Sequence, residues 1–262
     1  MTTFVDESGS GNRDAVVLLH GLGTSGWMWQ RIAPVLAEDL HVLVPDLPGH
    51  GRSARRWVSL ADTAQAVAEV IRSRTAAGRA HVVGLSLGGY VATLLAADEP
   101  AVVRSVVVSG VNVLPFAHPT MMRLFNRVVG PFATSAPLVR ANAKALKIPA
   151  ADLPGYRAAA REMARGTFTR VGEEVTEFKV PAAAGSSPCR LLALAGAEEN
   201  EMILRSLPAL TEGFARAEAR LVPGVGHAWS GEAPELFAAT VRAHIADTPL
   251  PAELYRPVED GA

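Results

Sequence analysis

Short runs of consecutive hydrophobic residues recur along this chain, and each has the length of a β-strand. They show little alternation of apolar and polar positions, which is typical of strands that are buried on both faces of a parallel sheet. The runs occupy residues 15–20, 41–45, 80–85, 102–109, 190–195 and 219–222, and residues 2–7 offer a further short edge strand.

Segments with helical character separate these runs, at residues 27–37, 60–76, 87–98, 201–217 and 233–246. Strands that alternate with helices predict an α/β fold, with a mostly parallel, doubly wound sheet and helices on both of its faces. In such a sheet, ligands bind beyond the carboxyl ends of the strands. Residues after Thr248 are expected to form a loosely packed tail.

The interval between residues 110 and 188 breaks the alternation. It contains short helical stretches punctuated by prolines and no convincing strand. A structureless loop of this length is implausible in a compact domain, so we predict an inserted helical cap. Met121, Phe125, Val128 and Phe132 recur there at helical spacing. We expect this stripe to pack against the core, with the lining of a substrate pocket as the alternative.

Composition narrows the class of protein. The chain has 262 residues, of which 49% are hydrophobic and 19% charged, and these values suit one sizeable globular core. A net charge of −1 gives no indication of nucleic-acid binding. Residues 113–180 carry a formal charge of about +5, which either steers anionic substrates or forms a solvated arginine-rich surface. The single cysteine, Cys189, excludes an intrachain disulfide.

No segment predicts a membrane span or a secretion signal. Residues 1–14 are polar and acidic, without the basic start and apolar centre of a signal peptide. The longest uncharged stretch, residues 82–97, is interrupted by glycines and is therefore not a continuous apolar span of about 20 residues. We therefore expect a cytoplasmic protein with no membrane partner.

The run Gly84-Leu85-Ser86-Leu87-Gly88-Gly89 carries the strongest chemical signal. It follows a predicted strand and opens a predicted helix, which is the context of a G-x-S-x-G nucleophile elbow. The sharp turn exposes the serine hydroxyl, and flanking glycines avoid clashes. Ser86 is the candidate nucleophile, and it needs a base because a serine hydroxyl is a poor nucleophile at neutral pH.

Two further glycine-rich turns follow predicted strands. One is His20-Gly21-Leu22-Gly23, where a backbone N–H can face a developing oxyanion. The other is Val225-Gly226-His227 near the end of the chain. A histidine at this place is the general base if the chain order is serine, acid, histidine.

These motifs, together with the run Asp46-Leu47-Pro48-Gly49-His50-Gly51-Arg52-Ser53, resemble the α/β-hydrolase fold superfamily, in particular members with a serine nucleophile and a helical cap. The resemblance covers nearly the whole chain. It implies a core of residues 1–112 and 186–262, and a cap of residues 113–185. It also implies that Ser86 attacks, that His227 moves the proton, and that the N–H groups of Leu22 and Leu87 form the oxyanion hole.

The acid is the least determined member of the implied triad. In the family it commonly follows the sixth parallel strand in a Gly-x-x-Asp pattern, and here that place reads Gly196-Ala197-Glu198-Glu199-Asn200. Glu199 takes the matching position, and a glutamate can still accept a hydrogen bond from the histidine. Glu198 and Glu201 are close enough to compete, and a triad without any carboxylate remains open.

Several other residues lie where they could contact a substrate. The candidate pocket residues are Trp27, His118, Met121, Phe125 and Trp229, and ordinary packing is the alternative for each. The resemblance implies a structural role for the strand-end His20 and a turn-ordering role for Asp46.

No metal or cofactor is predicted. The histidines are scattered and show no metal-ligand spacing. The glycine-rich turns lack the Lys-Ser/Thr of a P-loop and the full G-x-G-x-x-G pattern.

The leading hypothesis is a serine hydrolase that cleaves a carboxylic ester, lactone or thioester of a small to medium hydrophobic substrate through an acyl-serine intermediate. The alternatives are a cofactor-free C–C bond hydrolase, lyase or cyclase on the same triad, a ligand-binding receptor with a slow triad, and an inactive scaffold. The expected partner is a small-molecule substrate. The sequence leaves open whether the chain is a monomer or a homodimer.

Overall fold

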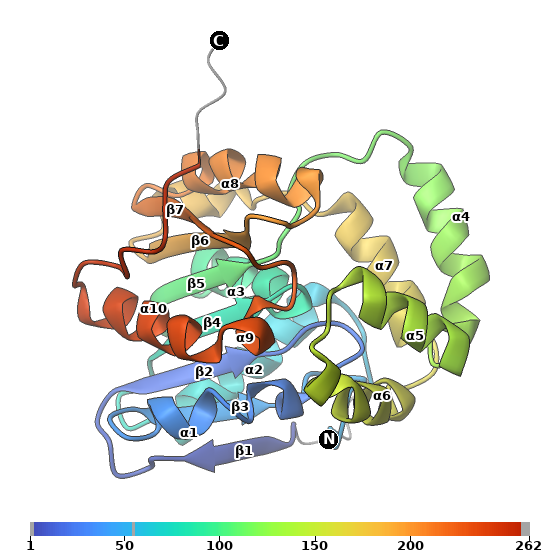
Figure 1. Cartoon of the computed structure of the whole chain (residues 1–262). Helices are drawn as coiled ribbons and strands as arrows, with labels where there is room; N and C mark the ends of the chain where they lie inside the picture. Colours follow the sequence, from blue (N-terminus) through green and yellow to red (C-terminus); the bar gives the residue numbers. More distant parts are fainter. Residues whose placement is uncertain (1–2, 54–55, 258–262) are drawn as a thin grey trace.

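A single twisted sheet forms the centre of the molecule (Figure 1). The computed structural model describes residues 3–53 and 56–257, and within these residues seven strands pair in the order β1-β3-β2-β4-β5-β6-β7. Only β1 is antiparallel to its neighbour; the other described strands are parallel. The strands are β1 Val5–Ser8, β2 Ala15–Leu19, β3 His41–Pro45, β4 Ala80–Leu85, β5 Val103–Ser109, β6 Arg190–Gly196 and β7 Ala217–Val222.

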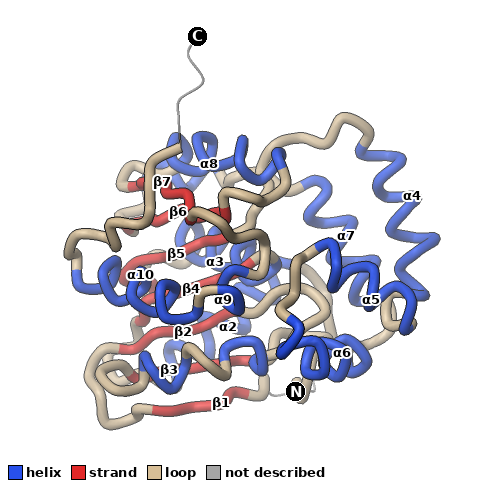
Figure 2. The backbone as a smooth tube through the Cα atoms, viewed as in Figure 1, coloured by secondary structure: helices blue, strands red, loops and turns tan. Residues whose placement is uncertain are grey.

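Helices cover both faces of the sheet (Figure 2). Because side chains alternate along a strand, Val17 and Leu19 pack against one helical layer and Val16 and Leu18 against the other. The first layer contains α2 Leu60–Arg74, α3 Leu87–Asp98 and α8 Glu201–Gly213, and the second contains η1 Gly26–Trp29, α1 Ala33–Leu36, α9 Trp229–Glu232 and α10 Pro234–Ala246. The predicted doubly wound, mostly parallel α/β sheet is confirmed.

The segment between β5 and β6 is helical, as predicted. We call these helices the cap. The α-helices among them lie beyond the carboxyl edge of the sheet (Figure 1), whereas the last short 3-10 helix packs against α3 in the core. The cap consists of α4 Pro119–Val129, η2 Gly130–Phe132, α5 Ala136–Ala145, η3 Ala150–Asp152, α6 Leu153–Glu162, α7 Thr167–Glu177 and η4 Ala182–Ser186. The division of the chain into a core of residues 1–112 and 186–262 and a cap of residues 113–185 stays a prediction.

Glu174 on α7 joins the cap to the core. Its carboxylate accepts hydrogen bonds from the indole Nε1–H of Trp57, at 2.9 Å, and from the backbone N–H of Leu60, at 2.7 Å. Leu60 is the first residue of α2, where backbone N–H groups lack acceptors within the helix and where negative charge is favourable. Glu174 therefore attaches α7 to the start of α2.

The predicted stripe on the first cap helix does not pack against the core. Met121, Phe125, Val128 and Phe132 are exposed to 64%, 54%, 60% and 63%. The polar side of α4 faces α7 instead, where Asn126 is buried. The stripe prediction is wrong because helical spacing indicates that a face is apolar but not which way that face points.

Local boundaries differ from the predictions in three places. The helix expected at residues 27–37 is split into η1 and α1, because Pro34 fits only in the first turn of a helix. The edge strand expected at residues 2–7 is Val5–Ser8, and Thr2 lies outside the described residues. The described part of the tail, residues 249–257, is not loose: Leu254 is buried, and Tyr255 exchanges backbone hydrogen bonds of 2.7 and 3.1 Å with Leu221, while residues 258–262 lie outside the described residues.

Within the described part of the chain, no helix has the length and apolar character that crossing a bilayer requires.

Candidate active site

Ser86 occupies a sharp turn between β4 and α3. Its backbone angles, φ 55° and ψ −116°, lie in a region that residues with a side chain rarely adopt. The flanking glycines are required sterically: a Cβ at Gly84 would lie 2.1 Å from the carbonyl oxygen of Gly88, and a Cβ at Gly88 would lie 2.1 Å from that of Leu19. The turn therefore needs glycine at both positions of the G-x-S-x-G pattern.

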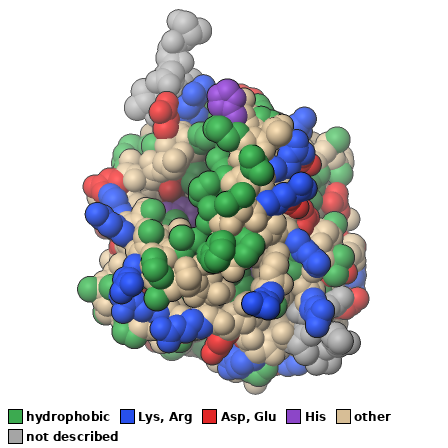
Figure 3. Space-filling view, turned by 90° about the vertical axis from the view of Figure 1, so that its right-hand side faces the viewer, with side chains coloured by type: hydrophobic (Ala, Val, Ile, Leu, Met, Phe, Trp, Pro, Cys, Tyr) green, Lys and Arg blue, Asp and Glu red, His purple; other side chains and the backbone are tan. Residues whose placement is uncertain are grey.

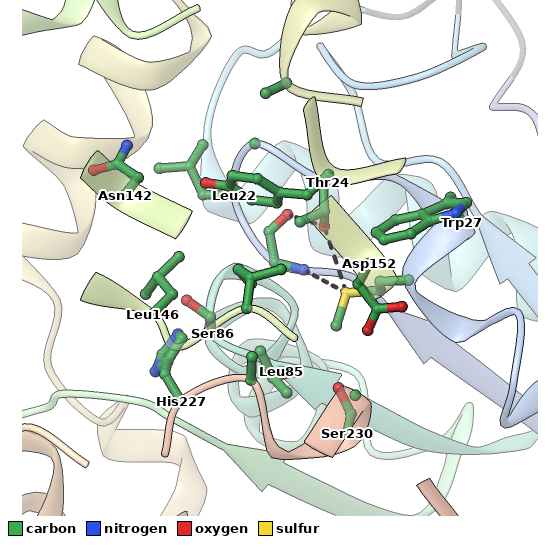
Figure 4. Close-up of a pocket in the computed structure, with 18 of the residues that line it drawn as sticks. Leu22, Thr24, Trp27, Leu85, Ser86, Asn142, Leu146, Asp152, His227 and Ser230 are labelled. Carbon is green, nitrogen blue, oxygen red and sulfur yellow. Dashed lines mark hydrogen bonds between the residues drawn. The ribbon is translucent and has the colours of Figure 1, made fainter. Parts of the chain in front are cut away.

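His227 lies in the loop between β7 and α9, and its side chain lies beside that of Ser86 (Figure 4), with which it lines the same two cavities. Its Nδ1 lies 2.7 Å from Oε2 of Glu199. The side chains of His227 and Glu199 are only 13% and 5% exposed, so this contact is shielded from water. A carboxylate at Nδ1 keeps the proton on that nitrogen and leaves Nε2 free to accept one.

The two adjacent glutamates after β6 point to different partners. Glu199 turns inward to His227, and its Oε1 accepts a 3.1 Å hydrogen bond from the backbone N–H of Asn200. Glu198 is exposed and forms an ion pair with Lys147, which follows the cap helix α5. Of the carboxylates that the sequence offered at this place, Glu199 is the one in contact with His227.

Two residues that line a cavity with Ser86 have backbone N–H groups for which the described part of the chain supplies no acceptor. Leu87 begins α3, so its N–H has no partner one turn earlier in the helix. Leu22 follows β2, and its N–H makes no backbone hydrogen bond with the described residues. Both residues line a cavity that also contains Ser86 and His227.

His20 and Asp46 build the frame beneath the site. His20 donates from Nδ1 to the carbonyl oxygen of Gly21 at 2.9 Å and accepts at Nε2 from the N–H of Leu47 at 2.9 Å. Burial lowers the pKa of His20 to about 4, so it stays neutral at pH 7. Asp46 accepts hydrogen bonds from the N–H groups of Gly26, at 2.7 Å, and Arg52, at 2.8 Å. Both side chains hold turns rather than face the cavities.

Two cavities meet at Ser86 and His227. The first has a volume of about 280 Å³ and extends between η1 and the cap helices, and the second, of about 570 Å³, extends toward α7 and α8. Leu22, Ala145 and Leu146 line both cavities. Because Leu146 follows α5, the cap contributes a residue that lines both cavities together with Ser86, and Figure 4 shows it on the same side of the pocket as Ser86 and His227.

The predicted pocket residues fall into two groups. Trp27 lines the first cavity and packs against α6, where a Cβ at Gly155 would lie 2.0 Å from its ring. Trp229 is instead fully buried in the core and donates from Nε1 to Oγ of Ser109 at 2.8 Å. The prediction that it lines the pocket is wrong, because its ring packs against Phe237 of α10.

His118, Met121 and Phe125 are also absent from the walls of both cavities. His118 is the exposed N-cap of α4, and the other two belong to its solvent-facing side. The cap residues that do line the first cavity could not be predicted from the sequence, because prolines divide the cap into short helices whose inward side carries no motif. These residues are Ala133, Val139, Asn142, Ala145, Leu146, Ile148, Pro149, Asp152, Tyr156, Ala160, Met163 and Phe168.

Among the residues that the structure describes, no three His, Cys, Asp or Glu side chains form a group that could hold a metal ion.

The fold and the serine elbow define an α/β hydrolase. A family model described as "Alpha/beta hydrolase family" matches residues 16–240, and the chain belongs to this family.

Among curated proteins, an "AB hydrolase superfamily protein" of Gibberella zeae is 38% identical over 114 residues, which cover 43% of this chain and 40% of that protein. A "Pimeloyl-[acyl-carrier protein] methyl ester esterase" of Sodalis glossinidius is 41% identical over 107 residues, covering 41% of this chain and 40% of that enzyme. These alignments thus span about two fifths of each relative's length.

Among solved structures, the enol-lactonase from Burkholderia xenovorans LB400 superposes with a TM-score of 0.79 at 20% identity, covering 93% of this chain and 96% of that one. At this level of identity the likeness shows a shared fold.

Proposed function

We propose that the protein is a serine hydrolase that cleaves a carboxylic ester, lactone or thioester through an acyl-serine intermediate. The observation that carries the proposal is the 2.7 Å contact between Glu199 and His227, beside a serine on a strained turn. A hydrogen-bonded acid and histidine next to a serine are the arrangement that activates a hydroxyl for attack on a carbonyl.

In this mechanism His227 accepts the proton of the Ser86 hydroxyl at Nε2 as the oxygen attacks the carbonyl carbon. It then donates that proton to the leaving alcohol or thiol as the acyl-serine forms. A water molecule, deprotonated by the same nitrogen, releases the acid in the second half of the reaction. Glu199 holds Nδ1–H and stabilises the imidazolium that forms in each half.

The N–H groups of Leu22 and Leu87 stabilise the oxyanion of each tetrahedral intermediate. A backbone donor at this position is typically worth about 3–4 kcal/mol of transition-state stabilisation. Leu87 contributes additionally as the first residue of α3, because the positive end of a helix dipole favours the developing negative charge.

The substrate proposed is small to medium in size and hydrophobic, with one part in each cavity. Hydrophobic residues, with alanine and valine counted, make up more than half of the lining of each cavity, and Ser86 lines both. The names of two proteins with the same family or fold, a methyl ester esterase and an enol-lactonase, support ester and lactone substrates.

Hydrolysis of p-nitrophenyl esters of increasing acyl length tests the proposal. We expect turnover by the wild type, none above background by Ser86→Ala, and a loss of roughly 10³-fold or more in kcat for Glu199→Gln, which cannot hold the histidine proton in the same way. Labelling of Ser86 by a fluorophosphonate, located by peptide mass spectrometry, identifies the nucleophile independently.

Glu198→Gln is the matched control, because it changes the neighbouring carboxylate, which faces Lys147. Its kcat is expected to stay within about 3-fold of wild type, as for an exposed ion pair. If Glu198→Gln and Glu199→Gln lose activity equally, the assignment of the acid is wrong. If the wild type hydrolyses no ester or lactone and Ser86 resists labelling, the proposal fails as a whole.

A further inference from the structure

The first cap helix, α4, and the short η2 that follows it present a hydrophobic face to solvent. Five large side chains, spaced three, four, seven and eleven residues from the first, are each more than half exposed. An exposed apolar surface of this kind marks a site of interaction with a protein, a membrane or a ligand. We call these residues the α4 stripe; they are Met121, Leu124, Phe125, Val128 and Phe132.

The orientation of α4 is fixed by its polar side. Arg123 and Arg127 form ion pairs with Glu177 and Glu173 of α7. Between them Asn126 is buried so closely against α7 that a Cβ at Gly172 would lie 2.7 Å from its amide. The helix cannot turn its apolar face inward without breaking these contacts, so the stripe stays exposed on the surface of the folded protein.

Positive charge flanks the stripe. In Figure 3, which views the cap side of the molecule, hydrophobic side chains gather in the middle of the face, and many Lys and Arg side chains with fewer Asp and Glu side chains lie on both sides of them. Arg140 on α5 and Arg157 and Arg161 on α6 line one small cavity of about 100 Å³, whose walls include no carboxylate. Thr134, two residues after the last stripe residue, lines the same cavity.

The net positive charge of the cap indicates which kind of partner could cover the α4 stripe. The segment 113–180 carries ten Lys and Arg but five Asp and Glu, so a second copy would place one positively charged cap against another. An anionic surface is complementary instead. Helices with an apolar face and flanking basic residues lie in the interface of membranes, where acyl chains take the apolar side chains and lipid phosphates pair with arginine.

We propose that the α4 stripe and the arginine group Arg140, Arg157 and Arg161 bind the surface of an anionic lipid bilayer. The stripe enters the headgroup region with α4 parallel to the membrane plane, and the arginines contact lipid phosphates. This needs no membrane span, so it is compatible with the finding that none of the described helices could cross a bilayer, although it departs from our expectation of no membrane partner. The proposal does not depend on the hydrolytic reaction.

Docking would place the site next to the lipid. Val139 of α5 lines both the arginine cavity and the first active-site cavity. One wall of the proposed substrate pocket is therefore also a wall of the cavity that would contact the membrane. A hydrophobic substrate dissolved in the bilayer would have only a short way to travel to the pocket.

Flotation of the full-length chain with vesicles tests the proposal without any activity assay. We expect binding to phosphatidylcholine vesicles that contain phosphatidylglycerol, and at least about 10-fold weaker binding to vesicles of phosphatidylcholine alone. High salt should weaken the binding because part of it is electrostatic. The variant Leu124→Ser/Phe125→Ser and, separately, Arg140→Gln/Arg157→Gln/Arg161→Gln should each bind at least about 10-fold more weakly.

Tyr255→Ser is the matched control: it also removes an exposed large side chain, but beside β7 instead of the cap. It should bind like the wild type, and thermal unfolding of every variant should match wild type because all changed side chains are exposed. Equal binding to both kinds of vesicle, no binding to either, or unchanged binding by both cap variants would overturn the proposal. A dimer in light scattering that dissociates in Leu124→Ser/Phe125→Ser would assign the face to a second copy instead.

Discussion

Gly110 lies directly against the imidazole of His227. A Cβ at this position would be 2.8 Å from Cε1 and 3.1 Å from Nδ1 of the ring. Gly110 also has φ +67°, which side chains disfavour, and it follows the last residue of β5. The imidazole ring therefore fills the space beside the end of β5, and residue 110 has no room for a methyl group.

Gly110→Ala is expected to lower kcat by about 10²-fold, because the new methyl group displaces His227 from Ser86 and Glu199. Ester hydrolysis and the pH dependence of kcat measure the effect. Gly224→Ala is the control, since Gly224 has a similar φ of +72° but open space around it. It should lose stability while its kcat stays near that of wild type; an equal loss of kcat in both variants would contradict the role of the ring contact.

Ser86→Gly is expected to stabilise the protein while abolishing hydrolysis. Ser86 adopts φ 55° and ψ −116°, and glycine enters this region without steric cost. Relief of the strain is worth about 1 kcal/mol in the free energy of unfolding, which urea denaturation can measure. Ser86→Ala also removes the hydroxyl but keeps the Cβ, so its stability should equal that of wild type. A glycine variant no more stable than the alanine variant would mean that the turn stores no strain.

Trp27→Ala and Val175→Ala separate the roles of the two cavities. Trp27 lines only the first and Val175 only the second. Each substitution enlarges one cavity, so each should shift the preferred chain length on one side of the ester bond, with kcat/KM for the longer substrate rising about 10-fold relative to the shorter one. Two series of esters, one varied in the acyl group and one in the alcohol, measure this. Shifts in the same series for both variants would show that the cavities do not hold opposite sides of the ester.

The stability of the protein should fall as the pH decreases from about 6.5 to 4. Burial lowers the pKa of His20, His81 and His244 to about 4 and that of His50 to about 3. In this range the unfolded chain binds protons at these residues and the folded chain does not, so protons favour unfolding. Each buried histidine contributes about 1.4 kcal/mol per pH unit to the free energy of unfolding.

Urea denaturation across this pH range measures the slope. His81→Gln removes one titrating group but can keep a hydrogen bond to Ser105 Oγ, which lies 2.8 Å from Nδ1 of His81. Its slope should be smaller than that of wild type by about 1.4 kcal/mol per pH unit. An unchanged slope would mean that His81 takes up its proton equally in the folded and unfolded chains.

The core of the fold was predictable because its signals are local. Uninterrupted apolar runs such as 15–19 identify buried strands, and the glycines around Ser86 identify the turn, since backbone atoms exclude any side chain there. Glu199 was favoured among neighbouring carboxylates only by its place in a family pattern. Its contact with His227 depends on how two loops more than twenty residues apart come together, which no local signal encodes.

The cap was predictable as helical but not in its orientation. Four stripe residues were recognised as one face of a helix, yet the direction of that face depends on Arg127 and Asn126, which contact α7. Similarly, a tryptophan beside a motif gives no indication of its direction: Trp27 faces a cavity, whereas Trp229 packs under it. These outcomes are decided by contacts between segments distant in the sequence.

The two glutamates after β6 are adjacent in the chain, and one contacts the cap while the other contacts the candidate base. Glu198 holds Lys147 at the end of the cap helix α5, and Glu199 holds His227. The outer ion pair is exposed to water, so it breaks and re-forms at little cost. The inner contact is shielded and is made by a different side chain. The cap can therefore detach at Lys147 while Glu199 keeps its hold on the histidine, so cap movement and orientation of the base are independent at this loop.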